Sequence, residues 1–137
     1  MLCAQLKKAD IARLKVEMRA LELNGICSRP VVEGTRYDLI LDTGEGLYRA
    51  QVKYGNGRST TSEGVVAVNL RKEIRKEKNQ PYLKEEIDVV LVYLPIVDKI
   101  CWFGPEIFHA KSALSIRIAP SKNGQVKHCL PAEKYFW

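Results

Sequence analysis

The sequence predicts a single α+β (or mixed α/β) domain, in which one long helix precedes a central sheet that is mixed but mostly antiparallel and flanked by helices. Three observations support this. Residues Gln5–Leu23 have the apolar spacing of a helix, two alternating runs flank a turn at 42–46, and Ile87–Leu94 is strongly β-prone. A chain of 137 residues can bury one core, so we expect one domain over 1–137.

The first segment is expected to be an amphipathic helix. Its large apolar residues follow the 3-4-3 spacing of one buried stripe: Ile11, Leu14, Met18 and Leu21. Asn24-Gly25 would end the helix, because both residues tolerate positive φ angles. Asp10, Arg13 and Glu17 follow the boundary between the apolar and the charged faces, at i, i+3 and i+7.

The strands that follow include one hairpin, formed by Tyr37–Leu41 and Leu47–Tyr54 around the glycine-rich turn. Alternate residues of its second strand face opposite sides, so Gln51 and Lys53 share one face. Ile87–Leu94 should be central because it is almost continuously apolar. Further strands are expected at Val65–Leu70, Lys99–Phe103 and Ser112–Ile118, and a last helical turn at Ala132–Phe136.

Composition excludes several classes of protein. Apolar content of 46% with a net charge of only +6 excludes a disordered chain. The most apolar stretch, Ile87–Val97, is too short for a membrane span, and the N-terminus lacks a signal-peptide pattern. We therefore expect a cytoplasmic protein with no membrane partner. The four cysteines and two histidines lack zinc-finger spacing, and the basic balance favours an anionic partner weakly.

The pattern that carries chemistry lies across the hairpin. Asp38 stands near the start of the first strand, and Gln51-Val52-Lys53 lies on the returning strand. For Mg²⁺, Asp38 would supply a carboxylate oxygen, Gln51 an amide oxygen and Val52 its carbonyl oxygen. Lys53 would hold the attacking water and offset charge in a phosphodiester transition state, as in a nuclease. An ordinary solvated hairpin face is the alternative that these residues alone leave open.

The sequence around these residues resembles a known family. Two stretches carry the resemblance: Arg36-Tyr37-Asp38-Leu39-Ile40-Leu41-Asp42 and Leu47-Tyr48-Arg49-Ala50-Gln51-Val52-Lys53. It extends to residues 8–12 and 86–93. These stretches resemble the PD-(D/E)XK endonucleases of bacterial group I introns, which are homing endonucleases with a restriction-endonuclease-like core. The resemblance implies Mg²⁺-dependent hydrolysis of double-stranded DNA at a long, specific site. Asp38, Gln51 and Lys53 match the motif's acidic, second acidic and lysine positions, and Tyr37 stands where the motif name has proline.

One position departs from the family's pattern. The family carries a glutamate on its first helix as an outer metal ligand, and Arg13 stands at the matching position. The charges of the site residues then sum to +1 instead of −1, which disfavours Mg²⁺ and favours phosphate. We therefore expect a chain that binds DNA but cuts it slowly or not at all. Asp10 or Glu17, as helix neighbours of Arg13, could substitute as the ligand.

DNA contacts are expected within a DNA-reading insertion around 55–86. The segment 71–78 is dense in positive charge and would form a helix or a long β-ribbon that reaches a groove, although a solvated charged face is the ordinary alternative. Residues that follow the strand of Gln51 and Lys53 would contact the phosphate backbone of the DNA. The candidates are Arg58, Ser59, Thr60, Asn69, Arg71, Lys72, Arg75, Lys76 and Lys78.

Size predicts assembly. A compact domain of this length is about 37 Å across and covers about eleven base pairs, so a long site needs at least a homodimer, with a tetramer as the larger option. The aromatic residues 135–137 are the expected contact, because chain ends usually lie at the surface. Two other functions stay open: a junction-resolving or repair nuclease of the same fold, and a DNA-binding module without catalysis, which Arg13 favours.

Overall fold

The computed structural model describes residues 4–58, 63–74, 77–120 and 128–137. Within them the chain forms one long helix, a short helix, a 3₁₀ turn and eleven strands. The elements are α1 (Ala4–Glu22), β1 (Ile26–Ser28), β2 (Leu39–Asp42), β3 (Leu47–Tyr54), β4 (Gly57–Arg58), β5 (Val65–Asn69), β6 (Arg71–Ile74), β7 (Glu77–Pro81), β8 (Val89–Leu94), β9 (Lys99–Phe103), α2 (Pro105–Phe108), β10 (Ala113–Arg117), β11 (Leu130–Pro131) and η1 (Ala132–Tyr135). None of the helices in these ranges is long and apolar enough to cross a membrane.

The main sheet has five strands in the order β1-β2-β3-β8-β9. All neighbours are antiparallel except β3 and β8, which run parallel with Gln51 opposite Val90. The prediction of a mixed, mostly antiparallel sheet is therefore confirmed. All six residues of β8 are buried, as a strand with both faces covered requires, and β8 pairs with a strand on each side.

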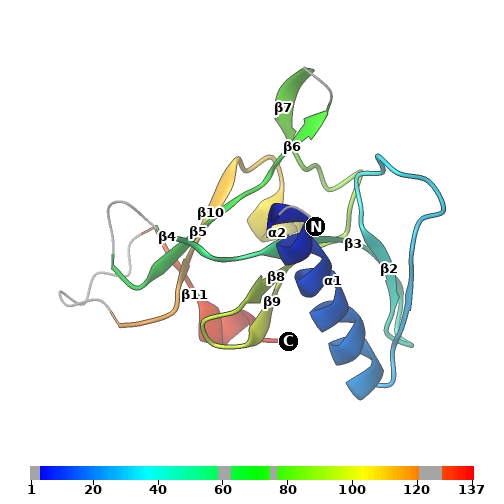
Figure 1. The fold of residues 1–137 in the computed structure, drawn as a ribbon, viewed down its shortest axis with the longest axis horizontal. Helices are drawn as coiled ribbons and strands as arrows, with labels where there is room; N and C mark the ends of the chain where they lie inside the picture. Colours follow the sequence, from blue (N-terminus) through cyan, green and yellow to red (C-terminus); the bar gives the residue numbers. More distant parts are fainter. Residues whose placement is uncertain (1–3, 59–62, 75–76, 121–127) are drawn as a thin grey trace.

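The helix α1 lies across one face of this sheet (Figure 1). It packs through a stripe of small residues at i, i+4 and i+8: Ala12, Val16 and Ala20. Together with them, one side of the sheet forms a core cluster that includes Leu39, Leu41, Ala50, Val52, Val89 and Leu91.

The predicted buried stripe of α1 was therefore wrong. Ile11, Leu14, Met18 and Leu21 are 43%, 53%, 58% and 70% exposed. Alanine and valine let the helix backbone approach the sheet closely, so the small residues take the contact and the larger ones turn outward. The predicted end of the helix is confirmed, since α1 stops at Glu22 and Asn24 has a φ of 62°.

The opposite face of the main sheet packs against a second sheet of four strands, in the order β11-β10-β5-β4. Their shared core contains Val66, Val68, Leu114 and Ile116 from the second sheet and Val90, Val92, Leu94 and Phe103 from the first. Side chains at odd positions of β8 thus face α1, and those at even positions face the second sheet.

The charged segment after β5 is a β-ribbon. Strands β6 and β7 pair antiparallel, with Arg71 opposite Pro81 and Lys72 opposite Gln80, and the ribbon projects from the body of the molecule (Figure 1). Of the two conformations left open by the sequence, helix or ribbon, the structure has the ribbon.

Candidate active site

The Asp38 carboxylate lies against the returning strand of the hairpin. Asp38 directly precedes β2, and its backbone N–H donates to the Ala50 carbonyl at 2.8 Å. Its Oδ2 accepts hydrogen bonds from the Gln51 side-chain nitrogen at 2.8 Å and from the Val52 backbone N–H at 2.9 Å. The structure therefore brings together the three residues that the sequence singled out as metal ligands.

Gln51 is the one buried polar or charged residue among those described, with 6% of its surface exposed. Its amide nitrogen bonds Asp38 and makes a longer contact of 3.4 Å with the Val52 carbonyl. Its amide oxygen is buried and has no hydrogen-bond partner in the described part of the chain. Buried polar atoms are rarely left unpaired, so this oxygen is a candidate acceptor for a ligand.

Lys53 follows on the same face of β3. Its Nζ lies 5.2 Å from the centre of the Tyr82 ring, and the Arg36 guanidinium lies 4.5 Å from the same ring. Arg36 is held in turn by the Glu86 carboxylate at 2.9 Å and by the Pro81 carbonyl at 2.8 Å. Arg36 and Glu86 lie within the stretches that resemble the family but were assigned no role from the sequence, and Tyr82 lies outside those stretches.

Strand β3 is fixed against the start of β8 by Arg49 and Asp88. The Asp88 carboxylate accepts from the Arg49 backbone N–H at 2.7 Å and from its guanidinium at 3.0 and 3.1 Å. In return the Asp88 N–H donates to the Arg49 carbonyl at 2.9 Å. The hydrogen bonds from Arg49 hold the pKa of Asp88 below its ordinary value. This brace sets the register of Gln51 and Lys53 beside β8.

Arg13 lies on α1, which covers the side of the sheet that carries Ala50 and Val52. Its guanidinium forms an ion pair with Asp10 at 2.9 Å, and its Nε is buried without a partner among the described residues. Glu17 accepts hydrogen bonds from two guanidinium nitrogens of Arg29, Nε and Nη2, at 2.6 and 2.8 Å, and these bonds lower the pKa of Glu17. Both acids considered as substitute ligands are thus engaged by arginines.

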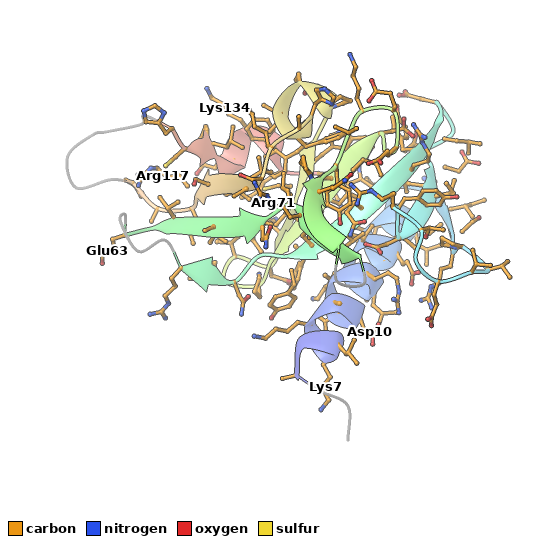
Figure 2. The ribbon with its side chains drawn as sticks, turned by 90° about the horizontal axis from the view of Figure 1, so that it is seen from above. Lys7, Asp10, Glu63, Arg71, Arg117 and Lys134 are labelled. Atoms are coloured by element: carbon orange, nitrogen blue, oxygen red, sulfur yellow. The ribbon has the colours of Figure 1, made fainter. Side chains whose placement is uncertain are left out.

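The predicted DNA contacts fall on the second sheet and the ribbon. Arg58 lies on β4, Asn69 ends β5, and Arg71 begins β6, where Figure 2 labels it; all three are exposed. The Asn69 side-chain oxygen accepts from the Arg71 N–H at 2.8 Å. Gly57 allows β4 to lie close to β5, since a Cβ there would be 2.5 Å from the Ala67 carbonyl oxygen.

The remaining candidates are only partly described. Lys72 belongs to β6 and Lys78 to β7, and the structure describes the main chain of these two residues but not their side chains. Ser59, Thr60, Arg75 and Lys76 lie outside the described residues.

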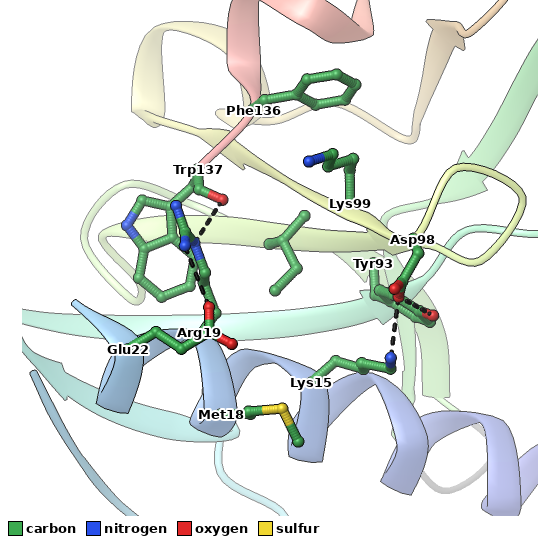
Figure 3. A pocket seen from close by; sticks show the side chains of 10 residues that line it. Lys15, Met18, Arg19, Glu22, Tyr93, Asp98, Lys99, Phe136 and Trp137 are labelled. Carbon is green, nitrogen blue, oxygen red and sulfur yellow. Dashed lines mark hydrogen bonds and ion pairs between the residues drawn. The ribbon is translucent and has the colours of Figure 1, made fainter.

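A pocket of about 360 Å³ lies elsewhere, between α1, the β8–β9 turn and the last residues (Figure 3). On one side Asp98 accepts hydrogen bonds from Lys15 at 2.9 Å and from Tyr93 at 2.8 Å. On the other side Arg19 donates to the Trp137 carbonyl at 3.1 Å. None of the residues that line it belongs to the group around Asp38.

Comparison with known proteins identifies the family and the fold. The sequence matches the model of the PD-(D/E)XK endonuclease family over residues 3–137, and no curated protein matches it. Among solved structures, a bacterial homing endonuclease, I-Ssp6803I, superimposes with a TM-score of 0.76. The match covers 98% of this chain and 89% of the other, at 23% sequence identity. The fold is thus the restriction-endonuclease-like one, and the chain belongs to the PD-(D/E)XK endonuclease family.

Proposed function

We propose that this chain is a site-specific endonuclease of intron homing, which hydrolyses phosphodiester bonds of double-stranded DNA at a long site. The observation that carries the proposal is the hydrogen bonding of Asp38 to Gln51 and Val52 across the hairpin, with Lys53 on the same face. Membership of the endonuclease family supports the chemistry. The structural likeness to a homing endonuclease supports the fold on which it would occur.

The side chains fit a hard divalent cation in the kind of donor that they offer. Asp38 would provide a carboxylate oxygen, Gln51 its unpaired Oε1 and Val52 its carbonyl oxygen. Within the described ranges no three His, Cys, Asp or Glu side chains gather into a metal-binding group, so a cation would depend on the amide and carbonyl oxygens. Bound Mg²⁺ would supply Lewis acidity and a more acidic water. Lys53 would orient that water and offset charge that develops on the phosphate.

The charge of this set predicts weak metal binding. Asp38 contributes one negative charge, Gln51 none, and Lys53 and Arg13 one positive charge each, which leaves +1. The ion pair with Asp10 offsets part of the Arg13 charge, so the larger effect of Arg13 is that a carboxylate ligand is missing and a divalent cation is held less tightly. We therefore propose that the chain binds its DNA well and cuts it slowly. The ion pairs of Asp10 and Glu17 support this, because neither acid can become a ligand without leaving its arginine.

A DNA-binding module without catalysis is the second candidate. Arg13, with a guanidinium where the family has a carboxylate, is the observation that favours it. In both cases segment 55–86 would read the DNA, with Arg58, Asn69 and Arg71 and the lysines of the ribbon as contacts.

We also propose that the working form is a homo-oligomer, a dimer at least. Phe103 and Tyr135 pack against each other at 4.8 Å and so contribute to the core, whereas Phe136 and Ile96 are 40% and 71% exposed. Leu14, Met18 and Leu21 add exposed apolar surface on α1. The mass in solution, measured by analytical ultracentrifugation with and without DNA, tests this; a monomer in both states would contradict it.

The deciding experiment is a cleavage selection from a randomised DNA library in Mg²⁺. It compares the unchanged chain with Arg13→Glu, and with Arg19→Glu as a control of equal charge change on the same helix. Cleavage by the Arg13→Glu variant alone, at a long and roughly palindromic site, is the expected result. Normal cutting by the unchanged chain refutes the proposed role of Arg13. If none cuts but all capture one sequence, the chain is the binding module.

A further inference from the structure

Tyr82 is a fully buried aromatic residue at the base of the β6–β7 ribbon. It follows β7 directly and is 1% exposed, among the largest fully buried side chains. Its hydroxyl is also buried and has no hydrogen-bond partner within the residues that the structure describes. Burial, and then the negative charge of Asp38, raise the pKa of this hydroxyl, so it stays protonated. Phenylalanine would fill the same space without an unpaired donor.

The ring of Tyr82 contacts two cations from two different segments. The Arg36 guanidinium and the Lys53 ammonium lie 4.5 and 5.2 Å from the ring centre, both within the range of cation–π attraction. Arg36 is fixed by Glu86 and by the Pro81 carbonyl, so the ring is held on a rigid base. Lys53 reaches the ring through a long side chain from β3, so the contact with the ring constrains the position of its ammonium group.

We propose that Tyr82 is a positioning residue of the active site, whose ring holds the Lys53 ammonium beside Asp38 and Gln51. The inference rests on the proposed function, because Lys53 is the residue that would orient the water. It adds a part that the motif does not contain: an aromatic platform supplied from the base of the β6–β7 ribbon. An ammonium group that is already fixed loses less conformational entropy in the transition state than a mobile one. A positioning residue raises the reaction rate by this reduction in entropy loss.

The test separates the ring from the hydroxyl. Tyr82→Leu removes the ring, and Tyr82→Phe restores the ring without the hydroxyl. Phe103→Leu is the matched control, since Phe103 is a fully buried aromatic of the same core cluster. All are made in the Arg13→Glu background so that cleavage is measurable. We expect Tyr82→Leu to lower the single-turnover rate about tenfold or more with DNA affinity kept, and Tyr82→Phe to recover most of that loss.

A second measurement does not depend on cleavage. The ring current of an aromatic side chain shifts nearby protons upfield, so the terminal methylene protons of Lys53 should be shifted in the unchanged chain and in Tyr82→Phe. In Tyr82→Leu they should return to the position of an exposed lysine, and in Phe103→Leu they should not move. A Lys53→Arg variant assigns the signals.

Two results overturn the inference: Lys53 signals that do not depend on the ring, or a Tyr82→Leu variant that cuts as fast as Tyr82→Phe. If no variant cuts any DNA, the proposed function fails instead, and the Lys53 signals alone decide whether Tyr82 positions the lysine.

Discussion

The Gln51 side chain donates from its nitrogen to Asp38 Oδ2 at 2.8 Å, while its amide oxygen is buried with no partner in the described structure. The amide adds no charge beside the carboxylate and donates a hydrogen bond to it, so the two side chains lie together without repulsion. A cation that bound here would gain the unpaired oxygen as a ligand and the carboxylate as its counter-charge.

Replacing this amide by a carboxylate should strengthen metal binding. Gln51→Glu changes the summed charge of Asp38, residue 51, Lys53 and Arg13 from +1 to zero. We expect tighter Mg²⁺ binding by calorimetry, together with a lower melting temperature in metal-free buffer, because two carboxylates then lie side by side. Gln80→Glu, an exposed glutamine on β7, is the control with the same charge change. Equal Mg²⁺ affinity in the two variants would show that Gln51 is not at the metal site.

The buried hydroxyl of Tyr82 gives a prediction on stability. Tyr82→Phe removes an unsatisfied donor and leaves the ring contacts in place. We expect the free energy of unfolding to rise by about 1 kcal/mol, measured by urea denaturation with unchanged m-value. A loss of stability would mean that the hydroxyl has a partner that this structure does not describe.

The strand pattern of the sequence was informative because side chains alternate between the two faces of a strand, and each face of the main sheet is covered by another layer. It predicted the hairpin, the shared face of Gln51 and Lys53, and a buried strand at β8, which is an interior strand of the sheet next to the edge strand β9. The helical apolar spacing failed on α1, where Leu14, Met18 and Leu21 compete with a stripe of small residues. Side-chain size, not hydrophobicity, selected the packed face, since a helix approaches a sheet most closely over alanine and valine. Tyr82 was not assigned to the site because its contacts join segments far apart in the chain.

The corrected face of α1 is itself testable. Leu14→Gln changes an exposed residue and should alter the unfolding free energy by no more than about 0.5 kcal/mol. Val16→Ala removes two methyl groups from a fully buried position and should cost about 1–3 kcal/mol. Chemical denaturation of the two variants decides the matter. The reverse order of effects would restore the stripe that the sequence pattern favoured.

The brace between Arg49 and Asp88 should give a pH dependence of known sign. Asp88 has its pKa lowered in the folded chain by Arg49, so its carboxylate stabilises the fold above the ordinary pKa of about 4. That contribution is lost as the pH falls through the folded pKa. Because the pair is partly exposed and screened by solvent, Asp88→Asn should destabilise the chain by no more than about 1 kcal/mol at pH 7, and the difference from the unchanged chain should shrink below pH 4 in urea titrations. A difference that is constant with pH would show that the carboxylate charge is not involved.

The proposed DNA surface predicts how affinity depends on salt. Each cation that neutralises a phosphate releases bound counterions, so the logarithm of the binding constant falls with the logarithm of salt concentration by about 0.9 per contact. Arg58→Ala and Arg71→Ala should each weaken binding and lower this slope by about one, for specific and random duplexes alike. Lys134→Ala, an exposed lysine on η1, is the control and should leave the slope unchanged. If the Arg71 variant instead keeps the slope and loses only the preference for the selected sequence, Arg71 reads a base edge rather than a phosphate. In that case the β6–β7 ribbon enters a groove of the DNA with Arg71 at the base of the ribbon, and of the two arginines Arg58 is the one that contacts a phosphate.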